Sequence, residues 1–426
     1  MNRKDFEIMA PVGSEESLSA AIAAGADAIY FGIEGLNMRS RSSSNFTIDD
    51  MRRIAAQCDA AGVKTYLTVN TIVYDADMEK MRSIIDAAKE AGISAIIASD
   101  IAAIMYAREI GQDVHISTQV NISNIEAVRF YARYADVMVL ARELSMEQVK
   151  AISDAIRSEN ICGPSGERVR LEMFCHGALC MAVSGKCYMS LHQMNSSANR
   201  GACNQICRRS YEVTDRETGE QLAVENQYIM SPKDLKTIHF LNKMVDAGVS
   251  VFKIEGRARG PEYVAEATRC YSEALTAICD GTYSEDKIAE WDSRLARIFN
   301  RGFWDGYYMG QRLGEWSSKY GSSATRVKRY IAKVNRYFPR LGVGEFTMLS
   351  GELRPGDEVI ITGPTTGALI FKAEELRLEY DPVAVVKKGD VFAMPVPEKI
   401  RLSDRLYLWE PVAPKGAAPA SDSEKE

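Results

Sequence analysis

Short apolar runs alternate with longer stretches of helical periodicity through most of the chain. A run of four to eight apolar residues bounded by turn residues predicts a buried strand, whereas apolar residues recurring every three or four positions predict a helix. The predicted strands cover residues 6–13, 28–32, 63–70, 95–99, 114–119, 136–142, 170–175 and 250–255. Helices are predicted after the first strand, ending at Gly25, and over residues 78–91, 101–109, 125–134, 146–157 and 261–279.

The order of these elements predicts an α/β fold. Strands that alternate with helices indicate a parallel sheet, and eight of them over about 250 residues is the number found in a (β/α)8, TIM-type barrel. An open, doubly wound sheet is the alternative. No GxGxxG motif follows the first strand to support a dinucleotide site in such a sheet.

Two segments depart from the strand–helix alternation. The eighth strand begins only at Ser250, so residues 176–249 form a long insertion at the C-terminal mouth of the barrel, with some helix over 232–247. Active sites of such barrels lie at this mouth. From residue 326, short strands separated by Gly and Pro turns predict a small β-barrel domain. We therefore expect a barrel domain over 1–325, a β domain over 326–412 and a disordered tail over 413–426.

Composition narrows the class of protein. With 426 residues, 46% of them hydrophobic, the chain can bury a full core. Its net charge of −6 argues against unspecific nucleic-acid binding but leaves room for a local basic patch. No apolar run reaches the ~18 residues that span a bilayer, and the first residues lack the apolar core of a signal peptide. We expect a cytoplasmic protein without a membrane partner, whose cysteines stay reduced.

Five of the nine cysteines fall within residues 171–209. They are Cys175, Cys180, Cys187, Cys203 and Cys207. The last three lie among Lys, Asn, Gln and Arg rather than in an apolar run, which argues against ordinary core cysteines or disulfides. Small residues nearby would let the thiolates converge on a metal. The uneven spacing favours an iron–sulfur cluster, with zinc as the alternative metal.

Charged residues near the ends of predicted strands are candidates for the site. Alternation places Glu172 and His176 on one face of the seventh strand with Cys175 on the other, so Cys175 and His176 should not form a nucleophile–base pair. Lys253 and Glu255 share a face of the eighth strand, and Arg142 ends the sixth. Glu172, His176, Lys253, Glu255 and Arg142, but not Cys175, are predicted to line the pocket. A structural salt-bridge network is the alternative.

Polar residues and arginines also gather at the predicted mouth. Asn70 and Gln119 lie at strand ends, as does His115, for which a structural role is the simpler interpretation. Seven arginines would form a rim that attracts phosphate, unless they are merely solvated. They are Arg39, Arg41, Arg200, Arg208, Arg209, Arg257 and Arg259. The sequence contains no Ser-His-Asp order, P-loop or HExxH motif.

The stretch Glu172-Met-Phe-Cys-His-Gly-Ala-Leu-Cys180-Met-Ala-Val-Ser-Gly-Lys-Cys187-Tyr-Met-Ser190 resembles the signature of the collagenase-like peptidase family U-32. Further blocks of the chain resemble that family and extend the likeness over most of its length. They are Ala10-Pro-Val-Gly-Ser-Glu-Glu-Ser-Leu, Gly25-Ala-Asp-Ala-Ile-Tyr-Phe-Gly32, Ser117-Thr-Gln119, Arg142-Glu-Leu-Ser145, Ser231-Pro-Lys-Asp234 and Lys253-Ile-Glu-Gly-Arg257.

The resemblance implies a function that differs from the family name. Better-understood members resemble oxygen-independent hydroxylases with a [4Fe–4S] cluster on four cysteines; some act on tRNA wobble uridine with prephenate, others on ribosomal RNA or ubiquinone precursors. By position, Cys180, Cys187 and Cys203 match family ligands, and Cys207 is the candidate fourth. A barrel followed by one small β domain is most similar to the tRNA uridine hydroxylation proteins.

The resemblance therefore implies an enzyme that makes 5-hydroxyuridine at tRNA wobble position 34. Catalytic roles would fall to Glu172, His176, Arg142, Lys253 and Glu255. Of these, Arg142 and Lys253 would hold the carboxylates of prephenate. Substrate binding would fall to Asn70, Gln119, Arg200, Arg208 and Arg257. Partners would be tRNA, a small-molecule metabolite and a further protein of the same family.

Two other hypotheses remain open from the sequence. A peptidase with zinc at the cysteines would cleave gelatin without a cluster. A non-enzymatic RNA-binding or scaffold subunit with a structural cluster would keep its function when Glu172 is changed to Gln.

Overall fold

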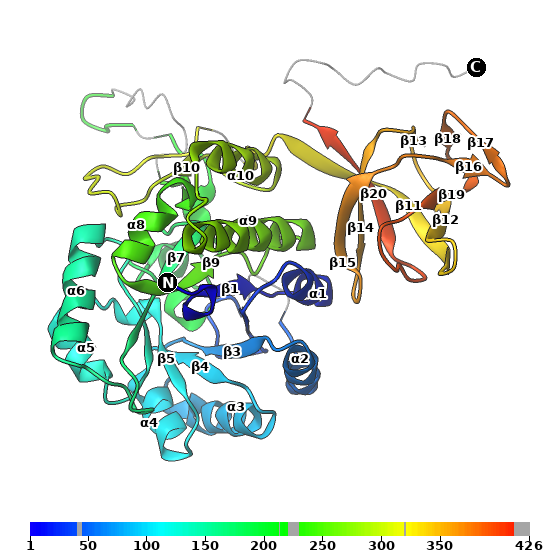
Figure 1. Ribbon diagram of the computed structural model, residues 1–426. Coiled ribbons are helices and arrows are strands. Elements are labelled where there is room, and N and C mark those ends of the chain that lie inside the picture. Colours follow the sequence, from blue (N-terminus) through cyan, green and yellow to red (C-terminus); the bar gives the residue numbers. More distant parts are fainter. Residues whose placement is uncertain (41–44, 213, 220–229, 319–320, 413–426) are drawn as a thin grey trace. The chain divides into compact units, whose positions relative to one another are not determined.

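The computed structural model describes residues 1–40, 45–212, 214–219, 230–318 and 321–412, and Figure 1 shows its elements. The predicted rim residue Arg41 and the predicted disordered tail over 413–426 lie outside the described residues. The chain divides into two compact units. Among the described residues, the first covers those of 1–323 and 363–368, and the second covers those of 324–362 and 369–412. The boundary predicted from sequence was residue 325.

The first unit contains a closed barrel of eight parallel strands, which confirms the predicted fold class. The strands are β1 (Glu7–Pro11), β2 (Ala28–Phe31), β3 (Lys64–Val69), β4 (Ala95–Ala98), β5 (Val114–Ile116), β6 (Val137–Val139), β7 (Arg170–Gly177) and β9 (Val249–Ile254). Neighbours along the chain pair from β1 to β7, and β9 pairs with both β7 and β1 to close the ring. Strands β2, β4 and β6 are continuous apolar runs because both of their faces are buried.

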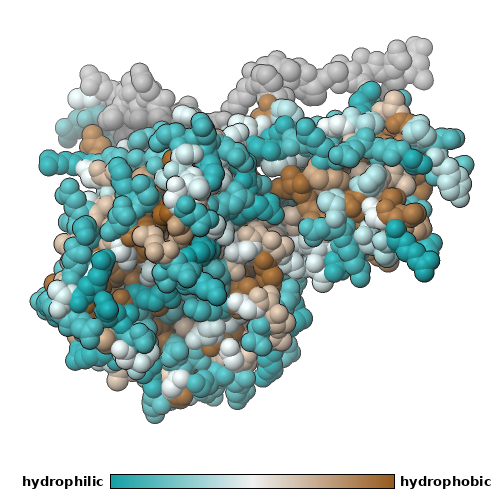
Figure 2. Space-filling model, in the orientation of Figure 1, coloured by the Kyte–Doolittle hydropathy of each residue, from teal (hydrophilic) through white to brown (hydrophobic). Residues whose placement is uncertain are grey.

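Helices cover the outside of the barrel (Figure 1). They are α1 (Glu15–Ala23), α2 (Ile48–Ala60), α3 (Met78–Glu90), α4 (Ile101–Glu109), α5 (Ile125–Tyr131), α6 (Met146–Ser158), α8 (Leu241–Asp246) and α9 (Pro261–Cys279). Several begin at a side chain that caps the first turn, such as Ser14, Asp100 and Asn124. Their outer faces are polar, and Figure 2 shows mostly hydrophilic residues over the visible side of this unit.

The segment predicted as helix over 232–247 is helical only in its second half. Residues Asp234–Lys236 form β8, which pairs antiparallel with the end of β7, and the helix α8 starts at Leu241. The pairing of Lys236 with His176 is a tertiary contact that outweighs local helix propensity. The same unit also contains α7 (Met189–Met194), α10 (Glu285–Arg297) and β10 (Phe303–Trp304), which pairs with β8.

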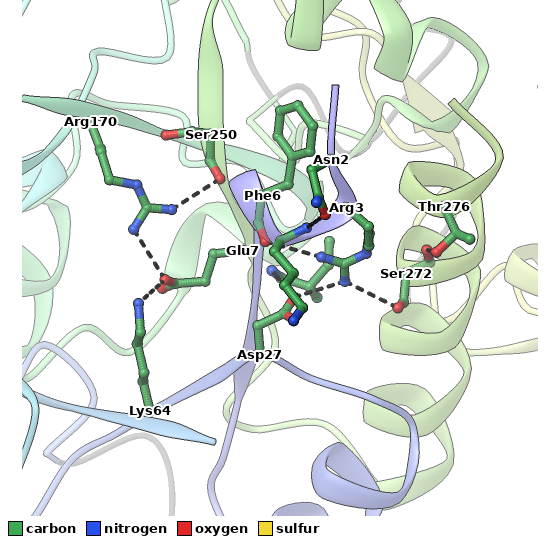
Figure 3. Close-up of polar contacts among 12 residues, drawn as sticks. Asn2, Arg3, Phe6, Glu7, Asp27, Lys64, Arg170, Ser250, Ser272 and Thr276 are labelled. Atoms are coloured by element: carbon green, nitrogen blue, oxygen red, sulfur yellow. Dashed lines mark hydrogen bonds and ion pairs between the residues drawn. The ribbon is translucent and has the colours of Figure 1, made fainter. Parts of the chain in front are cut away.

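An ion cluster closes the N-terminal end of the barrel (Figure 3). The Glu7 carboxylate at the start of β1 is buried and lies 2.9 Å from Lys64 Nζ and 3.3 Å from an Arg170 guanidinium nitrogen. It also accepts a hydrogen bond of 2.7 Å from the Tyr66 hydroxyl. A buried carboxylate must be paired in this way, so the cluster supports the barrel at the end opposite the strand C-termini.

The second unit is built from β-strands. They are β11 (Arg326–Phe338), β12 (Val343–Met348), β13 (Glu352–Leu353), β14 (Glu358–Gly363), β15 (Gly367–Lys372), β16 (Arg377–Leu378), β17 (Asp381–Pro382), β18 (Val386–Lys387), β19 (Val391–Pro395) and β20 (Arg405–Pro411). Eight of them form one sheet in the order β15-β14-β20-β11-β12-β19-β16-β17. Its core includes the stacked rings of Phe346 and Phe392.

Among the helices that the structure describes, none combines the length and the apolar character needed to cross a membrane.

Candidate functional site

A cavity lies at the C-terminal ends of the barrel strands. The strands and the loops that follow them contribute Tyr30, Arg39, Thr68, Asn70, Ile97, Gln119, Arg142, Phe174, Lys253, Glu255 and Arg257 to its lining. The other wall comes from residues 178–209, which we call the cysteine lobe. The insertion therefore lies at the barrel mouth, as predicted.

All four predicted ligand cysteines line this one cavity. Cys180 is exposed, whereas Cys187, Cys203 and Cys207 are partly buried. Burial raises the pKa of Cys207; Arg208 acts to lower it, and the other three thiols raise it further. The four sulfurs are therefore close enough to interact electrostatically. An all-sulfur donor set suits an iron–sulfur cluster or zinc, although as the described side chains stand, no three His, Cys, Asp or Glu groups form a ready metal site.

The cysteine lobe is held against the loop that follows β2. Gly201 has a φ of +79°, and a Cβ atom there would lie only 2.1 Å from the Asn37 carbonyl oxygen. Glycine is therefore required at this close approach of two backbones. Arg208 anchors the lobe from within by donating to the Leu179 carbonyl at 2.6 Å and the Pro232 carbonyl at 2.5 Å.

Glu255 is a carboxylate surrounded by the guanidiniums of Arg39, Arg142 and Arg257. Its carboxylate pairs with Arg39 at 2.7 Å and accepts a hydrogen bond of 3.2 Å from the Tyr30 hydroxyl. Burial acts to raise the pKa of Glu255, but the guanidiniums of Arg39, Arg142 and Arg257 outweigh it and lower that pKa to about 2. Glu255 is therefore a carboxylate throughout the physiological range and cannot serve as a general acid there.

Arg142, Arg208 and Arg257 are the cavity cations without a carboxylate partner within 4.0 Å among the described residues. Arg257 donates to the hydroxyl of Thr68 and the side-chain oxygen of Asn37, and burial lowers its pKa to about 10. Arg142 lies 3.7 Å over the Phe174 ring and donates to one backbone carbonyl at 3.1 Å. Its buried Nε has no hydrogen-bond partner in the described part of the chain, which leaves a donor for a bound anion.

Lys253 and Glu172 differ in their position relative to the cavity. Lys253 lines the cavity, whereas Glu172 is fully buried beneath it and is absent from the described lining. The two are joined by an ion pair of 2.7 Å. The expectation that Glu172 lines the pocket is therefore wrong; it supports Lys253 from inside the barrel.

The structure turns His176 away from the cavity. The register between β7 and β9 shifts between Phe174 and His176, so Cys175 occupies a bulge and the alternation of side chains is broken. The His176 ring packs against Tyr263, Tyr271 and Phe303 instead. Burial, with the nearby Lys236 cation, lowers its pKa to about 3. Strict alternation wrongly predicted that His176 faces the pocket.

Cys175 and His176 form no nucleophile–base pair. The Cys175 thiol is buried, donates to the Lys253 carbonyl at 3.5 Å, and has a pKa raised well above its usual value by burial. No histidine occurs among the described residues that line the cavity.

The remaining predicted substrate residues divide into two groups. Asn70, Gln119, Arg208 and Arg257 line the cavity, and the Asn70 amide donates to Gln119 at 3.2 Å. Arg200 does not line it among the described residues; it pairs with Asp77, stacks 4.1 Å from Tyr74 and ties the lobe to the loop after β3.

The predicted rim of arginines is therefore only partly assembled. Arg259 stacks over Phe299 at 3.5 Å, and Arg209 is exposed. Sequence reasoning did not single out Tyr30 or assign Arg39 to the pocket. The only local signal for either was its place at the end of β2 or in the loop beyond it.

Comparison with known proteins identifies the family. The model of peptidase family U32 matches residues 13–318. A protein of Porphyromonas gingivalis named collagenase is 66% identical over 96% of this chain and 99% of its own. The tRNA hydroxylation protein P1 of Bacillus subtilis is 32% identical over 74% of this chain and 75% of its own. The 23S rRNA 5-hydroxycytidine C2501 synthase of Escherichia coli is 34% identical over 73% of this chain and 46% of its own. The chain thus belongs to peptidase family U32.

Proposed function

We propose that this protein is an iron–sulfur-dependent, oxygen-independent RNA hydroxylase that makes 5-hydroxyuridine at the wobble position of tRNA. One observation carries the proposal: four cysteine thiols and a set of buried and partly buried cations line the same cavity. Relatives named for tRNA hydroxylation and for 5-hydroxycytidine synthesis in rRNA support an RNA substrate.

The cysteine lobe would hold the cluster on Cys180, Cys187, Cys203 and Cys207. The donor set is entirely sulfur. Arg208 acts to lower the pKa of Cys207, but burial and the other three thiols outweigh it, so binding of the cluster itself would have to deprotonate this thiol. When bound, the cluster would supply or relay electrons. The chain's own contribution is to place these thiols at the mouth where substrate enters.

Arg142 and Lys253 would hold a small dianion, for which prephenate is the candidate. The unpaired Nε of Arg142 and the cavity-facing ammonium of Lys253 offer charge-assisted hydrogen bonds to carboxylates. Replacing hydrogen by hydroxyl at C5 of uridine oxidises the base by two electrons. For prephenate to be the oxygen donor, it must give up an oxygen atom and accept those two electrons, which requires it to lie beside the base.

Peptide hydrolysis is the second candidate, and the name of the 66% identical relative favours it. The geometry favours it less, because the described cavity lining contains no histidine to activate a cysteine or serine. A peptidase would therefore need a metal-bound water, with zinc on the same cysteines.

The test begins with anaerobic purification and assays for iron, sulfide and zinc. We expect iron and sulfide in matching amounts, and loss of both in Cys187→Ser but not in Cys279→Ser, a partly buried cysteine of α9 outside the lobe. Nucleoside mass spectrometry of a deletion strain should then show wobble 5-hydroxyuridine restored by wild type and Cys279→Ser only. Hydroxylation that survives loss of Cys187 would refute the proposal. Zinc without sulfide, together with gelatin cleavage, would establish the peptidase. If the deletion strain instead lacks a hydroxyl group in rRNA or ubiquinone, the substrate is that molecule and not tRNA.

A further inference from the structure

Three ionisable side chains meet inside the barrel directly beneath the cavity. They are His115 of β5, Glu172 of β7 and Lys253 of β9, with exposed fractions of 6%, 0% and 5%. Glu172 lies between the other two: one carboxylate oxygen is 2.7 Å from Lys253 Nζ, and the other is 3.7 Å from His115 Nδ1. Only Lys253 reaches the cavity among these three.

Two atoms of this group are buried without a hydrogen-bond partner in the described structure. They are His115 Nδ1 and the Glu172 oxygen that faces it, Oε2. Buried polar atoms are normally satisfied, and an exception calls for an explanation. A proton on Nδ1 and a small movement of either side chain would join them, so the pair is arranged to gain and lose one hydrogen bond.

Two tyrosines and a buried apolar cluster surround this group. On one side the Tyr66 ring lies 4.3 Å from the His115 ring, and the Tyr66 hydroxyl donates to Glu7 at 2.7 Å. On the other side Lys253 Nζ lies 4.6 Å from the Tyr30 ring, whose hydroxyl donates to Glu255 at 3.2 Å. The apolar cluster that contains both tyrosines also includes Met9, Ala28, Ala95, Ile97, Val137 and Val251. A low dielectric strengthens the coupling between charges.

The charge state of Glu172 fits such coupling. Burial acts to raise its pKa, but Lys253 and His115 outweigh burial, and the net effect is a pKa below the usual value. Glu172 is therefore a carboxylate that can accept from either neighbour.

We propose that Lys253 is a catalytic residue that exchanges a proton with the substrate, and that Glu172 and His115 are positioning residues that restore its charge. The Lys253 ammonium gives one proton to an acceptor atom of the bound substrate and becomes a neutral amine. A proton from the His115 imidazolium passes through the Glu172 carboxylate to that amine, leaving neutral imidazole. A proton released by the substrate later in the reaction returns along the same path to His115 and restores the starting state. The identity of the substrate rests on the proposed function; the coupling of the three groups does not.

The barrel contains a matched control at its other end. Glu7 is also buried, at 3% exposure, and pairs with Lys64 and Arg170 (Figure 3). It contacts neither His115 nor the cavity among the described contacts. Glu7→Gln therefore removes a buried carboxylate that reaches the proposed unit only through Tyr66, whose hydroxyl donates to Glu7 and whose ring packs against His115.

The coupling is tested in the full-length protein by NMR of isotope-labelled histidine rings at fixed pH, with His115 assigned through His115→Gln. In Glu172→Gln we expect the His115 ring signals to shift, because Nδ1 loses the carboxylate oxygen that faces it at 3.7 Å. Lys253→Met should shift them too, because it removes the cation that pairs with the other oxygen of the same carboxylate. Glu7→Gln should shift them less than either. If Glu172→Gln does not fold, Lys253→Met and the double variant still report the coupling.

Unchanged ring signals of His115 in both Glu172→Gln and Lys253→Met would overturn the inference. Where hydroxylation is measured, His115→Gln should lower kcat and flatten the pH profile while KM for RNA stays unchanged. If wild type hydroxylates and His115→Gln keeps full kcat, the inference falls and the proposed function stands. If coupling is present but wild type does not hydroxylate RNA, the proposed function falls and the proton unit stands.

Discussion

Changing Glu255 to Gln should destabilise the barrel, and the structure gives the size of the effect. The Glu255 side chain is 16% exposed, and its pKa is lowered from 4.5 to about 2 by the guanidiniums around it. A difference of roughly 2.5 units corresponds to about 3 kcal/mol of stability, at 1.36 kcal/mol per unit. Removing the charge also leaves buried guanidiniums unpaired, which brings the expected loss at pH 7 to about 3–5 kcal/mol.

The pH dependence carries a definite sign. Because the folded pKa of Glu255 is depressed, its stabilisation is complete above the unfolded pKa of 4.5 and is lost as pH falls towards 2. At pH 3.5 about 1.4 kcal/mol of it should already be gone. The difference in stability between wild type and Glu255→Gln should shrink by that amount between pH 7 and pH 3.5.

The assay is hydrogen exchange of the β9 amides, which reports opening of the barrel even if the two units unfold separately. Glu410→Gln is the control, because Glu410 pairs with Arg329 in the second unit at 3.0 Å with both side chains at least a third exposed. Such a pair contributes about 0–1 kcal/mol. Sulfate should partly rescue Glu255→Gln by binding the freed cations. A Glu255→Gln protein as stable as Glu410→Gln at pH 7, or a deficit independent of pH, would refute this account of the cavity.

Two further predictions concern the cysteine lobe and the bulge. Gly201→Ala should lower both stability and cluster retention, because the added Cβ would meet the Asn37 carbonyl. The control is Gly281→Ala, where φ is +68° and the space is open, so only backbone strain should lower stability. Equal thermal shifts for the two variants would contradict the close approach at Gly201. The His176 ring signals should not move between pH 8 and pH 5 in an NMR titration, because burial keeps the pKa near 3; a midpoint near 6.5 would place the ring in solvent.

The barrel could be predicted from sequence because its strands are buried on both faces. Runs such as Ala28–Phe31 and Ala95–Ala98 are fully buried, so composition alone marks them. Helix α2 was not predicted, although Met51, Ile54, Ala55 and Cys58 form a buried stripe. Charged and polar residues fill most of the other positions of that helix, and they obscured the spacing of its apolar residues.

The site could be predicted less completely. Convergence of the four cysteines followed from the insertion's place at the barrel mouth, which is a property of topology. The bulge at Cys175 has no local sequence signal, since it arises from pairing with β9, and it sent His176 to the opposite face. Likewise, Glu172 lies too deep along the barrel axis to reach the cavity. The alternation of side chains along a strand predicts which face a residue occupies but not how deep it lies.

The charge of the cavity differs from the charge of the chain, and this difference bears on substrate. The whole chain carries a net charge of −6. Inside the cavity, Arg39 is balanced by Glu255 and Lys253 by Glu172, while Arg142, Arg208 and Arg257 have no carboxylate within 4.0 Å among the described residues. On the side formed by the strands, Arg142 and Arg257 therefore leave a positive excess that is at least partly buried, where salt screens it less than at the surface. A peptide bond carries no charge that would use these guanidiniums, whereas a dicarboxylate or an RNA phosphate would, so the electrostatics of this side of the cavity favour the hydroxylase over the peptidase.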